Sequence, residues 1–279
     1  MSNHTVDKFH SEDKVFKESF AIFKGKSLDF LDSEMTGNII EVLMNEHTET
    51  ITKKQFTDLV FKVSETKGRH HEWQHEINLD DLKRFLSYNT DLSRKYKELD
   101  FETIVITNKA PKVTQYINSS VTFKPRVIVL SERNSDETIE KITKQIEIGE
   151  PINELELIYL PMYNSPSGKS KVDLLSTSLK LSHKAIQDIE IRKKIQDLLI
   201  LLVAKYLSDE EFKKVLEDNM VILEDNAAVR VLGKMGEERG IEQEKKETAI
   251  LMLQKGFDKS TISEIIKKPL EWIEEIAVK

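Results

Sequence analysis

The sequence predicts an α/β domain over residues 1–165, followed by an all-helical region over residues 172–279. Three observations carry this prediction. Residues 101–107 (FETIVIT) and 125–130 (PRVIVL) are apolar on both faces, which is typical of central strands covered on each side. Apolar residues recur at helical spacing before and between the strand candidates. Residues 164–171 (NSPSGKSK) are rich in Pro, Gly, Ser and Lys, so they predict a linker.

The elements of the first domain follow from short local patterns. Residues 12–31 place apolar side chains on one helical face, and Gly25 is expected to end that helix. Residues 64–68 (SETKG) predict a hairpin turn. Two further helices are expected at residues 79–99 and 136–148. Strands are expected at residues 38–44, 56–63, 70–77, 101–107, 125–130 and 155–163.

The region after the linker reads as helical throughout. Residues 186–207 include the apolar run DLLILLVAKYL, which predicts a helix buried against other elements. Residues 236–255 predict a charged helix that Gly256 ends. Two short helices follow, separated near Pro269. We expect this region to serve packing or self-association, so a homodimer is a possible assembly.

The composition limits the class of function. The chain has 279 residues, 33% of them charged, and a formal net charge of −7, which argues against a protein that coats nucleic acid by bulk charge. Cysteine is absent, which excludes disulfides, thiolate catalysis and cysteine-based zinc sites. No apolar run approaches the roughly 18 residues of a membrane span, and the N-terminal residues lack an apolar signal core. We therefore expect a cytoplasmic protein without a membrane partner.

The strongest functional pattern is a pair of acidic residues in the hairpin over residues 57–76. Asp58 opens the first strand, and Glu72 lies on the returning strand with Gln74 on the same face, because side chains two residues apart on a strand share a face. The length of the two arms and the turn places the two acids roughly opposite each other. Two such carboxylates can hold Mg²⁺ or Mn²⁺, since these hard cations prefer oxygen ligands.

These motifs resemble the PD-(D/E)XK nuclease superfamily, and within it the Rpn family of recombination-promoting nucleases and transposases. The resemblance extends over most of the chain. The matching stretches are Phe16-Lys17-Glu18, Asp29-Phe30-Leu31, Asp58 to Val63, Glu72-Trp73-Gln74, Arg84 with Tyr88, Gly240-Ile241-Glu242 and Leu253 to Asp258.

The resemblance implies a restriction-endonuclease-like mixed sheet flanked by helices and a metal-dependent endonuclease that hydrolyses DNA phosphodiester bonds. Asp58 and Glu72 would bind the metal. Gln74 stands where most of the superfamily has Lys, and Gln can only hydrogen-bond, whereas Lys also stabilises negative charge. Lys62, on the same strand face as Asp58, is a candidate to supply that cation. Arg84 is a candidate phosphate contact, and an i,i+4 ion pair with Asp80 is its structural alternative.

The same letters contain a second motif, His71-Glu72-Trp73-Gln74-His75, which is a literal HExxH zinc signature. In zinc peptidases this motif works on a helix, where its two histidines share a face. We favour a strand, on which His70, His71 and His75 are expected at exposed polar positions. A third alternative is a relative that retains the nuclease fold without catalysis and acts as an interaction protein.

Overall fold

The computed structural model describes residues 20–43, 59–74, 76–204, 206–223 and 226–277. The chain divides into two compact units, Met1–Val229 and Arg230–Lys279. The boundary predicted between residues 165 and 172 therefore lies inside the first unit.

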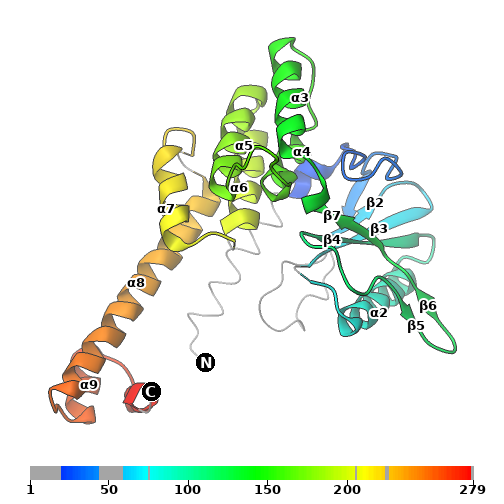
Figure 1. Ribbon diagram of the computed structural model, residues 1–279. Helices are drawn as coiled ribbons and strands as arrows, with labels where there is room; N and C mark the ends of the chain where they lie inside the picture. Colours follow the sequence, from blue (N-terminus) through cyan, green and yellow to red (C-terminus); the bar gives the residue numbers. More distant parts are fainter. Residues whose placement is uncertain (1–19, 44–58, 75, 205, 224–225, 278–279) are drawn as a thin grey trace. The chain divides into compact units, whose positions relative to one another are not determined.

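The first unit is mixed α/β, as the sequence predicts, and is built on a five-stranded mixed sheet of order β1-β2-β3-β4-β7 (Figure 1). Strands β1, β2 and β3 pair antiparallel, while β4 and β7 run parallel to β3. The strands are β1 (Glu41–Leu43), β2 (Leu59–Lys62), β3 (Lys67–Gln74), β4 (Asp100–Thr107) and β7 (Arg126–Val129). Each of them overlaps a strand that the sequence predicts.

Helices α2 (Leu79–Lys95) and α3 (Ser135–Glu147) also confirm the sequence pattern. The side chain of Asn78 accepts hydrogen bonds from the first turn of α2, and the carboxylate of Asp81 accepts one from the backbone N–H of Asn78, which forms a capping box. Asn134 caps α3 in a similar way by accepting two backbone hydrogen bonds.

The strand predicted at residues 155–163 is wrong. These residues form helix α4 (Glu154–Tyr159) and the 3-10 turn η4 (Leu160–Met162). Asn153 caps α4 by accepting a hydrogen bond from the backbone of Leu155. Every residue of α4 except the first is buried. A short run buried on all sides has no informative periodicity, so its apolar letters cannot distinguish a strand from a helix.

Helix α2 covers one face of the sheet, here called the α2 face. At one end, Leu92 and Leu99 pack with Val60 of β2 and Phe101 of β4. At the other end, Leu82, Phe85 and Val105 share a buried cluster. The α2 face is therefore apolar at both ends of the helix.

The opposite face is covered by the segment at residues 20–40 and by helix α4. Phe23, in the 3-10 turn η1 (Phe20–Phe23), stacks on Phe61 of β2 with ring centroids 5.5 Å apart. The helix predicted over residues 12–31 lies outside the described residues up to residue 19. The described end of the predicted helix is only this 3-10 turn, and Gly25 follows it with a φ of 82°, a conformation that glycine adopts without strain.

The remainder of the first unit consists of helices and one small hairpin. Helix α6 (Ile189–Ala204) carries the predicted apolar run, and its residues from Ile195 to Val203 are all buried. A separate two-stranded hairpin, β5 (Tyr116–Ile117) with β6 (Thr122–Phe123), follows β4. The other helices are α5 (Lys171–Ala185), α7 (Asp209–Asp218) and the start of α8 (Ala227–Gln254).

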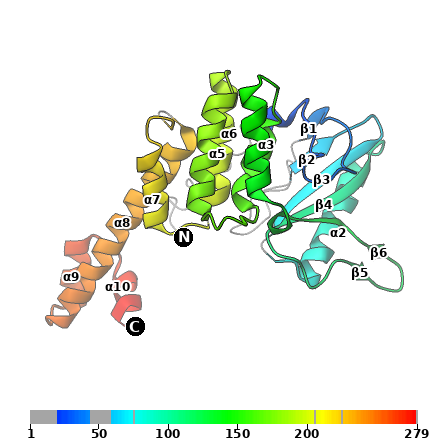
Figure 2. The same ribbon diagram turned by 45° about the horizontal axis from the view of Figure 1, so that its top comes forward.

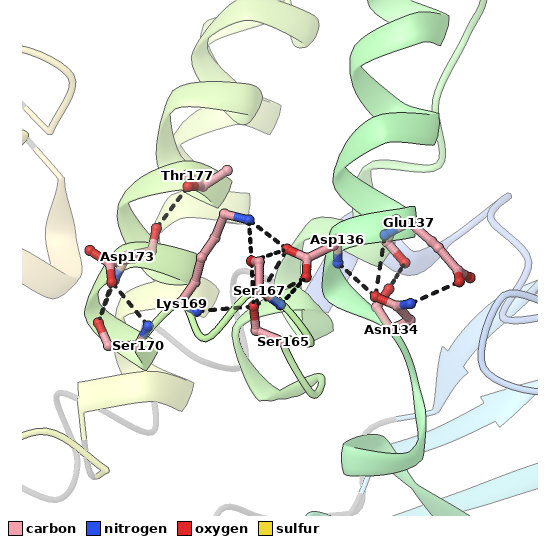
Figure 3. Close-up of polar contacts among 10 residues, drawn as sticks. Asn134, Asp136, Glu137, Ser165, Ser167, Lys169, Ser170, Asp173 and Thr177 are labelled. Carbon is pink, nitrogen blue, oxygen red and sulfur yellow. Dashed lines mark hydrogen bonds and ion pairs between the residues drawn. The ribbon is translucent and has the colours of Figure 1, made fainter.

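The segment predicted as a free linker is anchored to α3 through Asp136 (Figure 3). The carboxylate of Asp136 accepts hydrogen bonds from the backbone and the hydroxyl of Ser167, both at 2.8 Å, and pairs with the ammonium of Lys169. The Lys169 hydrogen bond, followed by those from Ser167, lowers the pKa of Asp136 to about 2. Polar contacts therefore fix this loop although it lacks an apolar anchor.

The second unit is a small helical cluster. Its core contains Ala249 of α8, Ile262 and Ile266 of α9 (Lys259–Ile266), and Ile273 of α10 (Leu270–Ala277). Gly256 ends α8 with a φ of 84°, as the sequence predicts. Of the helices in the described part of the chain, none combines the length and the apolar character that a membrane crossing requires.

Candidate functional site

The central strand β3 directs alternate side chains to the two faces of the sheet. The ring of His70 meets the ring of Tyr88 on α2, with centroids 6.1 Å apart and planes at 77°. Because side chains alternate along a strand, Glu72 and Gln74 lie on the same α2 face as His70. All three are buried, although they are polar. This row of polar side chains under α2 is the candidate site.

Glu72 is at the centre of this row. Its side chain is 4% exposed, and its Oε1 lies 3.2 Å from Nε2 of His70. Nε2 of Gln74 donates to the other oxygen, Oε2, over 3.5 Å, a long hydrogen bond. The structure therefore brings Glu72 and Gln74 together on one face, as the sequence predicts. It also adds His70, which the sequence did not place in the site.

The prediction that His70 and His71 are exposed is wrong. They are 0% and 3% exposed. His71 lies on the opposite face, edge-on to Phe61 with centroids 5.0 Å apart. Burial, followed by the nearby charges of Arg69 and His70, lowers the pKa of His71 to about 3, so this ring is neutral at physiological pH. Burial comes from α2 and residues 20–40, which are distant in sequence, so local polarity did not reveal it.

The helical form of the HExxH motif is also excluded. His71, Glu72, Trp73 and Gln74 all lie in strand β3, and His71 and Glu72 therefore point to opposite faces. His75 lies outside the described residues. Trp73 packs on the opposite face, stacked on Tyr159 at 5.6 Å, and its indole N–H donates to the hydroxyl of Tyr206. A helical two-histidine zinc site cannot form on this backbone.

The two other predicted site residues of the hairpin are Asp58 and Lys62. Asp58 lies outside the described residues, and β2 begins at the next residue, Leu59, which pairs with His71. Lys62 pairs with Gly68, four residues before Glu72, a distance of about 13 Å along the strand. Its ammonium forms an ion pair with Glu65 at 2.9 Å. Lys62 shares the predicted face but is not brought to Glu72.

Arg84 forms an ion pair with Asp81, three residues earlier, at 3.2 Å. An ion pair within the helix was the predicted alternative to a phosphate contact. The predicted partner was Asp80, however, which pairs with Lys83 instead. The side chain of Arg84 remains 29% exposed, so it is accessible to a ligand.

Polar groups of β4 extend the site along the α2 face. Thr103 is buried, and its hydroxyl oxygen accepts a hydrogen bond from the side chain of Asn89 on α2 at 3.0 Å. Asn89 also donates to the backbone oxygen of Phe101. Thr103 was not predicted as a site residue, because it lies inside the apolar run FETIVIT. Thr103 lies two residues from both Phe101 and Val105 in the sequence. This spacing could have predicted a polar side chain on the same face of the strand as those two.

Of the two carboxylates predicted to hold a hard cation, Glu72 is a buried group on the α2 face, and Asp58 is outside the described residues. Among residues that the structure does describe, no group of three or more His, Asp or Glu side chains is placed to hold a metal ion. The buried acid, its amide partner Gln74 and the adjacent His70 could orient a bound water or accept a proton.

Comparisons of the chain with protein-family models, with curated proteins and with solved structures gave no significant match.

Proposed function

We propose that this protein is a Mg²⁺- or Mn²⁺-dependent DNA endonuclease of the PD-(D/E)XK type, with a restriction-endonuclease-like fold in its α/β part. The observation that carries the proposal is the position of Glu72 and Gln74, side by side on the helix-covered face of the central strand. The mixed sheet with α2 over that face is compatible with the fold that the sequence resemblance implies.

The register of β2 and β3 supports a second carboxylate at the same place. Leu59 with His71 is the last described pair of this antiparallel ladder. One more pair in the same register would join Asp58 with Glu72. Val60 and Lys62 of β2 share one face, and a residue at position 58 in an extended strand would share it too. The proposal requires this one-residue continuation.

Asp58 and Glu72 would hold the metal ion, which supplies an activated water and stabilises negative charge on the phosphate. Gln74 donates its amide hydrogen to Glu72 and thereby orients the carboxylate. Gln cannot provide the positive charge that Lys provides in most of the superfamily, so another cation must stabilise the charge on the phosphate.

Arg84 is our candidate for that cation. Helix α2 runs back along β3, since Leu92 packs near Val60 and Tyr88 contacts His70. Arg84 precedes Tyr88 by four residues, or about 6 Å of helix. Glu72 follows His70 by two residues, or about 6.6 Å of strand. Arg84 would therefore be level with Glu72, and its guanidinium suits a phosphate.

Plasmid nicking in Mn²⁺ tests the proposal. We expect Asp58→Ala and Glu72→Ala each to reduce nicking at least about a hundredfold, because each removes a metal ligand. Glu65→Ala is the matched control, since Glu65 is an 85% exposed acid of the same hairpin. Circular dichroism establishes that each variant is folded. Undiminished nicking by both site variants would refute the nuclease proposal.

One observation favours a second candidate, an interaction protein that retains the fold without catalysis. Glu72 is 4% exposed and both of its oxygens face neighbouring side chains. A buried carboxylate with such contacts would stabilise the fold instead of binding a metal ion. Failure of the wild-type protein to bind Mn²⁺ at millimolar concentration would support this candidate.

We also propose that the second unit mediates a homodimer, which would supply two active sites for cutting both DNA strands. In its support, Leu251, Phe257 and Ile265 are large apolar side chains that are each about half exposed. Light scattering of the wild type and of Leu251→Lys tests this, with a change from dimer to monomer expected. A wild-type monomer at micromolar concentration would contradict it.

A further inference from the structure

The segment from Thr103 to Ser131 differs in charge from the rest of the chain. Its 29 residues contain no Asp or Glu, although about five would be expected at the average frequency of this chain. The same segment contains four basic residues, Lys109, Lys112, Lys124 and Arg126. In a protein with a net charge of −7, this segment therefore adds positive charge and no carboxylate of its own, which favours the approach of anions.

The centre of this segment is the hairpin of β5 and β6. Tyr116 pairs with Phe123 and Ile117 with Thr122, so residues 118–121 form the tip. The side chain of Asn118 accepts hydrogen bonds from the backbone of Ser120 and Val121, which fixes the tip. Figures 1 and 2 show from two directions that the hairpin projects from the sheet beside α2.

The inner side of the hairpin is attached to α2. Val113, Tyr116 and Phe123 pack against the cluster that contains Leu82 and Phe85. The ammonium of Lys83 lies 6.0 Å from the centre of the Tyr116 ring. The hairpin is thus anchored to the helix that also covers Glu72.

The outer side is exposed and combines basic and hydrogen-bonding groups with two apolar side chains, Ile117 and Val121, which are 58% and 38% exposed. Lys112 and Lys124 are exposed, and neither forms an ion pair with a residue in the described part of the chain. By contrast, Arg126 is bound by Asp32, Glu34 and Glu102, and Lys109 lies 3.7 Å from Glu76. The other exposed polar residues of the hairpin are Thr114, Gln115, Asn118, Ser119, Ser120 and Thr122.

We propose that the outer side of the β5–β6 hairpin binds the phosphate backbone of double-stranded DNA and positions the duplex beside helix α2. Lysine, serine, threonine, asparagine and glutamine side chains are the usual phosphate contacts of DNA-binding proteins. A two-stranded ribbon also has dimensions that fit the major groove. This inference rests on the proposed nuclease function, for which it supplies the substrate-binding surface.

DNA binding in EDTA tests the inference apart from cleavage. Fluorescence anisotropy with a labelled 30-base-pair duplex would compare the full-length wild type with Lys112→Gln/Lys124→Gln. We expect affinity to fall by about an order of magnitude at 0.1 M salt, and the slope of log K against log salt to decrease by about two, because two phosphate contacts are lost. The control is Lys180→Gln/Lys184→Gln, two exposed lysines of α5, which should remain within about twofold of wild type.

Wild-type affinity and salt slope in the hairpin variant would overturn the inference, as would equal losses in the hairpin variant and the control. Preference of the wild type for an RNA duplex of the same sequence would also overturn it. The nuclease proposal fails separately, when the wild type binds DNA in EDTA but does not cut it in Mn²⁺. If the hairpin variant binds DNA as tightly as the wild type and still cuts it, only the role of the hairpin is refuted.

Discussion

The two faces of strand β3 present the same kinds of residue in different surroundings. On the opposite face, Arg69 donates to the backbone oxygens of Met35 and Thr36, and Trp73 stacks on Tyr159. On the α2 face, His70, Glu72 and Gln74 form a row of polar groups that contact one another. The opposite face is built for packing between distant segments, whereas the α2 face gathers groups that suit binding or catalysis.

The largest expected effect is the loss of packing on the opposite face. Phe61 is fully buried between Phe23 and His71. We expect Phe61→Ala to lower the free energy of unfolding by about 3–5 kcal/mol, because it leaves a cavity in the core. Urea denaturation measures this loss. A loss below about 1 kcal/mol would show that this face is not the packing core.

The next effect depends on pH. Since the folded-state pKa of His71 is about 3 and the unfolded value is about 6.5, acid protonates this ring only in the unfolded chain over that window. Stability linked to His71 is therefore complete above pH 6.5. It is lost by about 1.4 kcal/mol per pH unit as the pH falls toward 3.

Urea denaturation from pH 7 to pH 4 compares the wild type with His71→Leu, in which this dependence is absent. The difference between the two proteins should change by roughly 3 kcal/mol over that range. Parallel curves would show that His71 is not a buried neutral ring.

A smaller effect is expected at the apolar end of the α2 face. A Cβ atom on Gly68 would overlap the ring of Phe101, which is itself buried. We expect Gly68→Ala to destabilise the protein by about 1–3 kcal/mol, the usual cost of overpacking. The double variant Gly68→Ala/Phe101→Leu should recover part of this loss in thermal denaturation. If the double variant is no more stable than Gly68→Ala, the destabilisation does not come from the contact between residue 68 and the ring of Phe101.

The smallest stability effect is expected at the site itself. Glu72→Gln keeps an acceptor beside His70 and removes a charge from a predicted acidic cluster, so we expect a change below about 1 kcal/mol without metal. If Glu72 were instead half of a structural ion pair with His70, its removal would cost about 3–5 kcal/mol. Denaturation in EDTA distinguishes the two roles.

The sequence predicted the strands and helices of the sheet region because their periodicity is local. Strand β4 was evident from its continuous apolar letters, and α2 from its helical spacing. The two-residue spacing also placed Glu72 and Gln74 on one face. These features depend on neighbours in sequence, which the letters report directly.

The remainder depends on contacts between distant segments. The burial of His70 and His71 follows from α2 and residues 20–40, and the strand's polar letters gave the opposite impression. Lys62 has the predicted face, yet pairing fixes its level at Gly68, far along the strand from Glu72. The face on which a side chain lies follows from the alternation along one strand. Its position along the sheet depends on the register between two strands, which the pattern of a single strand does not give.

The most direct test of the central claim is Mn²⁺ binding measured by isothermal titration calorimetry. We expect the wild-type protein to bind Mn²⁺, and Glu72→Gln and Asp58→Asn each to lose at least about tenfold in affinity. Glu65→Gln should bind as the wild type does. Equal Mn²⁺ affinity in all four proteins, or no binding by any of them, would contradict a metal site on the α2 face.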